Sequence, residues 1–204
     1  MSSKILLACL MVVGIASCGA EKPEQELIVS AMQSLTGRPS NAQSSQSVES
    51  IRRQLTPDLR ERLGNKALLI ARLENRDQAS VLIQSGVNRD VVTYVTPDGI
   101  SLSLRDGVLV GTRGLGFDLM NTDVSEMAMR DGGQAVRVHR YLDGENRIVI
   151  KSFICDYKGV NPIVEACAGK NTQFQNSYRV SASKIIASRQ WIGPEVGYIQ
   201  VELP

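Results

Sequence analysis

The sequence predicts a mainly β fold built of antiparallel meanders, with short helices at the N-terminal end of the chain. From Asn65 onward, about ten short apolar and β-branched segments alternate with turn residues. No segment between them is long enough for a crossover helix, so neighbouring strands should run antiparallel. The chain has 204 residues, of which 43% are apolar and 22% charged. This composition is typical of a globular domain and excludes a disordered chain.

The turns between the predicted strands contain residues that favour reversal of the chain. Thr96–Gly99 includes a proline that fixes φ and a glycine that tolerates positive φ. Asp106-Gly107 is a two-residue hairpin turn. Residues 114–133 form a longer connection. The predicted strand segments are, in order, ALLIARLE, ASVLIQS, VVTYVT, ISLSLR, VLVGTR, AVRVHRYL, RIVIKSFICDY, SYRVSASKIIASRQWIG (two strands) and GYIQVELP.

Two parts of the strand region share a similar layout. ALLIARLENRDQASVLIQ and AVRVHRYLDGENRIVIKS both read as strand, four-residue turn and strand. ISLSLRDGVLVGTRGLGFDL and YRVSASKIIASRQWIGPEV are also alike. We interpret the likeness as two related four-stranded halves, with coincidence as the alternative.

Short helices are predicted before the strands. Apolar residues recur at helical spacing over 27–35 and stop at Gly37, and a polar, linker-like segment follows over 38–49. Pro57 interrupts a second apolar stripe, which predicts two short helices with a break near Thr56-Pro57. We expect this stripe to pack against the domain rather than form a coiled coil. It consists of Ile51, Leu55, Leu59 and Leu63.

The N-terminus has the features of a lipoprotein signal peptide. Lys4 precedes an apolar run of 11 residues, which is too short to span a bilayer but suits a signal-peptide core. Two small residues then precede Cys18, so we predict cleavage before Cys18 and lipidation of its thiol. A secretory signal with an incidental cysteine is the alternative. Cys9 has a similar context, but cleavage there would leave almost no apolar core.

These features predict three segments and a location. Residues 1–17 form the signal peptide, 18–49 the lipidated N-terminus with a helix and linker, and 50–204 a single mainly β domain. Residue 19 is glycine. An aspartate there retains many lipoproteins in the inner membrane, so we expect a lipid anchor in the outer membrane that faces the periplasm.

Two cysteines remain after processing, Cys155 and Cys167. The periplasm is oxidising, so we predict a disulfide that closes a short loop and stabilises the fold by about 3 kcal/mol. A metal or redox pair is the alternative. The spacing differs from CxxC, and neither a histidine nor a second cysteine pair stands nearby.

The composition excludes several functions. Lys and Arg number 23 against 21 Asp and Glu, so we expect no nucleic-acid partner. His139 is the only histidine of the chain, so a metal site with two histidine ligands is excluded. A serine or cysteine nucleophile would have His139 as its one candidate histidine base. No cofactor motif is present, because GTRGLGFDL lacks the third glycine of a dinucleotide fingerprint. We therefore expect no catalytic residue, cofactor or metal. Several acidic residues could serve a glycosidase, but the sequence does not pair them.

Four residues are candidates for a glycan or partner surface. Trp191 is the only tryptophan and follows Arg189 and Gln190 directly, and Arg113 occupies a similar place in the other half. Such residues could combine stacking with hydrogen bonding to a sugar. The alternative is that Trp191 fills the core or a strand edge.

The segments VTPDGISLSLRDGVLVGTRGLGFDLM and FQNSYRVSASKIIASRQWIGPEVGYIQVELP resemble the YjbF/GfcB-type lipoproteins. The resemblance covers about two-thirds of the chain. It implies a mostly β, periplasm-facing protein of the outer membrane, associated with group 4 capsule and exopolysaccharide production. It implies other polysaccharide-secretion proteins of the envelope as partners and brings no catalytic residues.

Together, these observations predict a non-enzymatic accessory or binding factor in capsule or exopolysaccharide assembly or export. Its expected partners are the membrane, through the lipid anchor, other envelope proteins of secretion, and the polysaccharide itself. The alternatives are a periplasmic glycan-modifying enzyme and a general envelope chaperone or lipid-binding lipoprotein.

Overall fold

The computed structural model describes residues 47–76, 78–124, 130–142, 145 and 147–204. The predicted signal peptide, Cys18 and the helix predicted over 27–35 lie outside these residues. Within the described part of the chain, no helix is long and apolar enough to cross a membrane.

The described chain forms two short helices, α2 (Val48–Gln54) and α3 (Pro57–Arg62), a 3-10 turn η1 (Glu74–Arg76) and twelve strands. The strands are β1 (Leu68–Leu73), β2 (Gln78–Asn88), β3 (Val91–Val95), β4 (Ser101–Arg105), β5 (Val108–Arg113), β6 (Leu119–Val124), β7 (Gln134–Leu142), β8 (Ile148–Lys158), β9 (Ile163–Ala168), β10 (Gln173–Ser181), β11 (Lys184–Gly193) and β12 (Gly197–Glu202).

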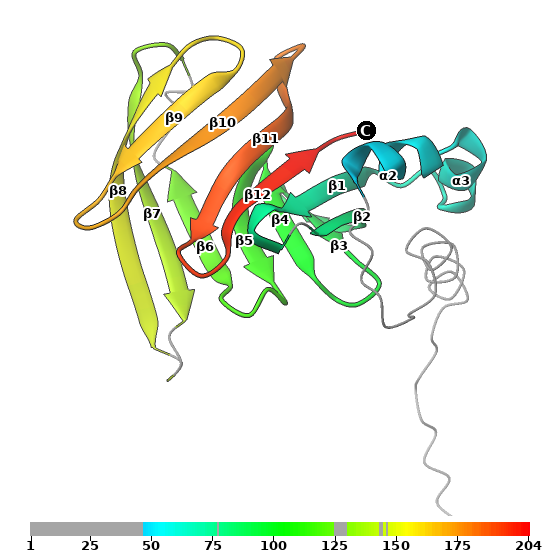
Figure 1. Cartoon of the computed structure of the whole chain (residues 1–204), viewed down its shortest axis with the longest axis horizontal. Helices are drawn as coiled ribbons and strands as arrows, with labels where there is room; N and C mark the ends of the chain where they lie inside the picture. Colours follow the sequence, from blue (N-terminus) through cyan, green and yellow to red (C-terminus); the bar gives the residue numbers. More distant parts are fainter. Residues whose placement is uncertain (1–46, 77, 125–129, 143–144, 146) are drawn as a thin grey trace, which may run out of the picture.

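All twelve strands belong to one antiparallel sheet that curls into a nearly closed, barrel-like shape (Figure 1). Its order is β5-β4-β3-β2-β1-β12-β11-β10-β9-β8-β7-β6. The pairing of β1 with β12 joins the run of strands β1–β5 to the run β6–β12. The end strands β5 and β6 also meet, because the backbone N–H of Leu119 donates to the hydroxyl of Thr112 at 3.0 Å.

The predicted fold class is confirmed, but the sheet has twelve strands rather than about ten. The two additional strands are β6, inside the predicted connection 114–133, and β9, which begins in the predicted disulfide loop and runs through Cys167. Both place a polar side chain in the interior, Thr122 in β6 and Glu165 in β9, which hides the alternation typical of a strand. The sheet divides at the β1–β12 pair into a run of five strands, β1–β5, and a run of seven, β6–β12, rather than into two four-stranded halves.

The interior of the sheet is filled by inward-facing side chains. One cluster gathers mainly leucines of β1–β5 with the ends of β11 and β12, including Leu69, Leu102 and Ile192. A second cluster lies between β7 and β11 and is rich in aromatic rings, including Phe153, Phe174 and Trp191.

The two helices cover the outer face of β1 and β2, so these strands are buried on both faces. The predicted stripe Ile51, Leu55, Leu59 and Leu63 packs there against residues such as Ile70 and Val81. Thr56 caps α3 by accepting from the N–H of Leu59, and Pro57 occupies the first turn, where its missing N–H costs nothing. The predicted break between two short helices is confirmed.

Candidate functional site

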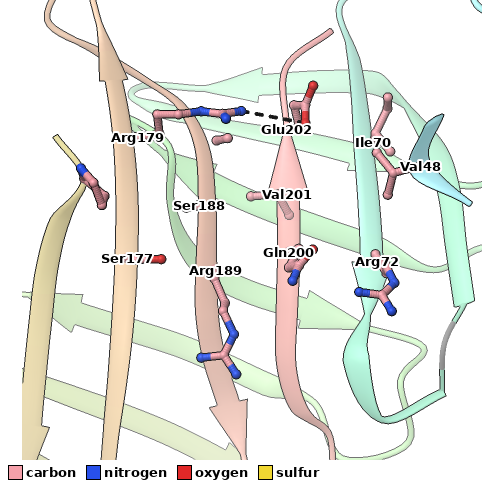
Figure 2. A pocket seen from close by; sticks show the side chains of 12 residues that line it. Val48, Ile70, Arg72, Ser177, Arg179, Ser188, Arg189, Gln200, Val201 and Glu202 are labelled. Atoms are coloured by element: carbon pink, nitrogen blue, oxygen red, sulfur yellow. Dashed lines mark ion pairs between the residues drawn. The ribbon is translucent and has the colours of Figure 1, made fainter. Parts of the chain in front are cut away.

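A groove of about 340 Å³ crosses the outer face of the sheet over β10, β11, β12 and β1 (Figure 2). Val48 of α2 and Pro162, just before β9, also line it. The lining residues come from segments that lie far apart in the sequence. Strand pairing brings together those of β10, β11, β12 and β1.

The register of the strands arranges the groove residues in two rows. Paired residues on adjacent strands point to the same face of a sheet, so each row lies on one surface. The first row is Ser177, Arg189, Gln200 and Arg72, and the second is Arg179, Ala187, Glu202 and Ile70. The first row is therefore polar throughout, and the second combines an ion pair with the small side chain of Ala187.

Arg189 is held firmly within the first row. Its Nε and Nη2 atoms each donate to a carboxylate oxygen of Glu74 at 2.7 Å. Its guanidinium also lies 3.4 Å from the ring centre of Tyr198. Gln200 donates to the same glutamate at 2.7 Å. The hydrogen bonds from Arg189 are the largest influence on the pKa of Glu74, and they hold it below its ordinary value.

The second row contains a carboxylate shared by two arginines. Glu202 accepts from Arg52 of α2 at 2.8 Å and lies 3.9 Å from Arg179 (Figure 2). The groove and the side chains bonded to it thus contain four arginines and two glutamates. The arginines are Arg52, Arg72, Arg179 and Arg189, and the glutamates are Glu74 and Glu202, which gives a net charge of +2.

Of the four residues predicted as a surface, Arg189 lies in the groove. Trp191 is 8% exposed and lies in the core, where it stacks on Phe174 with ring centres 4.5 Å apart. Successive residues of a strand point to opposite faces, and a bulge after Trp191 changes the register of β11 against β12. Sequence neighbours therefore do not form one surface here.

Gln190 and Arg113 lie elsewhere. Gln190 is 1% exposed and joins β11 to β5, since its side chain accepts from the N–H of Leu109 and donates to the carbonyl of Gly107. Arg113 is exposed at the end of β5 and donates to the carbonyl of Thr112. The structure therefore separates these residues from the groove that contains Arg189.

A buried ion pair is the polar feature that sequence reasoning missed. Arg137 and Glu165 are 2% and 0% exposed, and Nε and Nη2 of Arg137 donate to the two carboxylate oxygens at 2.9 and 2.8 Å. Tyr157, Tyr178 and Asn176 each donate to Glu165 at 2.7 Å. Burial alone would raise the pKa of Glu165, but Arg137 and these donors hold it below its ordinary value. The only sequence signal was a charged residue at an inward position of each strand.

His139 lies in the core beside this network. It is 0% exposed, and its Nδ1 atom lies 2.8 Å from the hydroxyl of Tyr141. Its Nε2 atom has no hydrogen-bond partner among the described residues. Burial lowers the pKa of His139 to about 3, with contributions from Arg137 and Lys151. The imidazole is therefore neutral at physiological pH and enclosed by the core.

The predicted disulfide between Cys155 and Cys167 is confirmed. The two residues face each other in register on β8 and β9, so the predicted loop is a hairpin. Glu165 lies near both sulfurs, and these three residues form the one metal-ligand-type grouping among the described residues. Thiolates are the form of cysteine that binds metals, and the disulfide removes them.

One comparison with known proteins identifies a family, and another identifies a similar fold. The family model described as "Group 4 capsule polysaccharide lipoprotein gfcB, YjbF" matches residues 52–203. The crystal structure of the hypothetical lipoprotein YmcC from Escherichia coli (K12) is similar, with a TM-score of 0.62 and 17% sequence identity. The similarity covers 78% of this chain and 96% of that chain, and identity this low shows a shared fold alone. No curated protein matches the sequence.

Proposed function

Because the chain belongs to the YjbF family of group 4 capsule polysaccharide lipoproteins, we propose that it is an accessory or binding factor in the assembly or export of a capsule or exopolysaccharide. The family match carries this proposal, since it spans residues 52–203 and so nearly the whole described fold. The protein is anchored in the outer membrane through a lipid on Cys18, faces the periplasm and acts beside other secretion proteins of the envelope.

The groove supports binding rather than catalysis. A glycosidase requires a carboxylic acid with a raised pKa beside a second carboxylate. Glu74 has a lowered pKa because of Arg189, and Glu202 is paired with Arg52. Both carboxylates are paired with arginines, and the lowered pKa makes Glu74 poorly suited to donate a proton. This pairing supports the proposed non-enzymatic role.

The interior argues against a carrier of lipids. Such a protein needs an apolar cavity inside the β structure. Here the inward-facing side chains of the described strands pack against one another in two clusters. The polar network of Arg137 and Glu165 occupies part of this interior and is satisfied by its own hydrogen bonds.

Deletion and complementation test the proposal. A strain that lacks this protein should lose most of its surface and secreted polysaccharide, and the wild-type chain should restore it. Cys18→Ala should fail to restore it, because the lipid contributes most of the membrane affinity. Cys9→Ala is the matched control, since Cys9 leaves with the predicted signal peptide, and it should restore polysaccharide fully.

Two results would contradict different parts of the proposal. Unchanged polysaccharide in the deletion strain would remove the protein from the pathway. Full rescue by Cys18→Ala, with the variant still in the outer-membrane fraction, would show that the anchor lies elsewhere.

A further inference from the structure

We propose that the groove over β10, β11, β12 and β1 binds a segment of polysaccharide that carries carboxylate groups, as in a chain of uronic acid residues. This inference rests on the proposed function and names the ligand and its site. The groove is defined by its two rows of side chains, Ser177–Arg189–Gln200–Arg72 and Arg179–Ala187–Glu202–Ile70.

The charge of the groove selects an anionic ligand. Its surroundings have a net charge of +2, while the whole chain is close to neutral for its size, also at +2. The residues that line the groove itself include three arginines and one glutamate. Guanidinium groups suit the task, because their planar fork donates two parallel hydrogen bonds to a carboxylate.

The arginines are in part positioned before any ligand arrives. Glu74 and the ring of Tyr198 fix Arg189, and Glu74 also holds Gln200. Side chains that are already ordered lose little conformational entropy on binding. Arg179 differs, since its side chain is 58% exposed and lies 3.9 Å from its partner Glu202. Arg179 can therefore turn toward a ligand carboxylate and lose only its weak interaction with Glu202.

The shape of the groove suits a sugar chain. Ser177 and Ala187 are small and sit in adjacent rows, so they leave a hollow in the groove, which Arg179 and Arg189 also line. A volume of about 340 Å³ lies at the lower end of the range for small-ligand sites. Because the groove lies on the outer face of a sheet, a polymer can cross it and continue into solvent at both ends.

The same position disfavours an extended acidic peptide. Peptides that bind to sheets usually add a strand at a free edge, through backbone hydrogen bonds. All four strands under the groove are paired with neighbours on both sides, so their backbone groups are engaged. Recognition must come from side chains. Arginine, glutamine and serine donors with the Glu202 acceptor match the hydroxyl and carboxylate groups of an acidic sugar.

Calorimetric titration of the full-length protein in detergent micelles tests this inference. The probes are oligogalacturonate, neutral dextran oligosaccharide of similar length, and poly-glutamate. We expect oligogalacturonate to bind, with an affinity that falls as salt is added, because exposed charges are screened. Dextran should bind at least tenfold more weakly. Absence of oligogalacturonate binding, or tighter binding of poly-glutamate, would overturn the inference.

Three variants locate the binding. Arg179→Ala should weaken oligogalacturonate binding about tenfold, the usual size of one lost charge-assisted hydrogen bond. Ala187→Phe should block the hollow without altering any charge. Arg105→Ala is the matched control, because Arg105 is also a strand arginine paired with a carboxylate, Asp90, but lies outside the groove. The Arg105→Ala variant should bind oligogalacturonate with the affinity of the wild type. If it lost as much affinity as Arg179→Ala, the attraction would be nonspecific and the inference would be overturned.

The same variants separate this inference from the proposed function. In the deletion strain, folded Arg179→Ala and Ala187→Phe should restore less polysaccharide than Arg105→Ala does. If the deletion lowers polysaccharide but both groove variants restore it fully, the groove assignment is wrong and the proposed function stands. If the deletion leaves polysaccharide unchanged, the proposed function is wrong, whatever the titration shows.

Discussion

His139 is the only histidine of the chain, and it is neutral because of where the fold places it. The rings of Phe153, Phe174 and Trp191 surround it, with ring centres 5.4 to 5.9 Å from its own. Its hydrogen bond with Tyr141 fixes the ring in this setting. The imidazole of His139 therefore completes a packed aromatic core, and it resists protonation as long as the protein is folded.

This setting predicts a pH dependence of stability. The pKa of His139 is about 3 in the folded protein and about 6.5 when unfolded, so acid protonates the unfolded chain first. The free energy of unfolding should therefore be intact above pH 6.5 and fall as the pH drops toward 3. Between pH 7 and pH 5 we expect a loss of about 2 kcal/mol. Urea unfolding at several pH values measures this loss. If a His139→Gln variant lost stability equally steeply, the protonation of His139 would not be the cause.

The buried pair of Arg137 and Glu165 predicts a second effect at this scale. Glu165→Gln keeps the shape of the side chain but leaves Arg137 charged and unneutralised in the core. We expect a loss of about 3–5 kcal/mol in the free energy of unfolding. Asp58→Asn removes the exposed pair with Arg62 and should change stability little, as expected of surface pairs. If urea unfolding showed similar losses for the two variants, the stabilising role of the buried pair would be contradicted.

At the scale of elements, the strands with apolar alternation could be predicted from the sequence, and those with polar inward residues could not. Ten of the twelve strands overlap the predicted segments, although β2 and β10 extend beyond theirs. β9 was missed because Glu165 faces inward and finds its partner Arg137 on β7, in a contact that no local pattern reveals. β6 was missed because Thr122 lies between Asn121 and Asp123 and gives no apolar period.

The candidate site was less predictable than the fold. Arg189 was identified, but its sequence neighbours Gln190 and Trp191 are buried. The residues that do share its surface, Ser177 and Gln200, are set by the registers of β10 and β12 against β11. Register depends on the assembled sheet, so a surface that crosses several strands leaves no motif in one segment.

The disulfide gives a prediction for the β8–β9 hairpin. The sequence separation between Cys155 and Cys167 is 12, and both are buried in the aromatic cluster. Replacing both by alanine should lower the free energy of unfolding by about 3 kcal/mol, chiefly because the unfolded chain regains its freedom. Guanidinium unfolding of the double variant and of the reduced wild type measures this loss. Equal stability of the oxidised and reduced wild type would contradict it.

At the scale of the whole molecule, the groove lies where the two halves of the sheet meet. The pairing of β1 with β12 joins the first and last strands, and the groove extends across both. α2 lies at the same place, since Val48 lines the groove and Arg52 bonds to Glu202 at its floor. The predicted lipid anchor at Cys18 precedes α2 in the sequence, and α2 itself lies beside the proposed ligand site.

The chemical structure of the polysaccharide made without this protein tests the central claim most directly. We would isolate the polysaccharide from inside and outside the deletion strain and compare its repeat unit with the wild type by NMR and mass spectrometry. An accessory factor changes the amount exported, so we expect less polysaccharide outside the cell, with the same linkages and substituents. A repeat unit with an altered linkage or a missing substituent would show that the protein is an enzyme and contradict the proposed function.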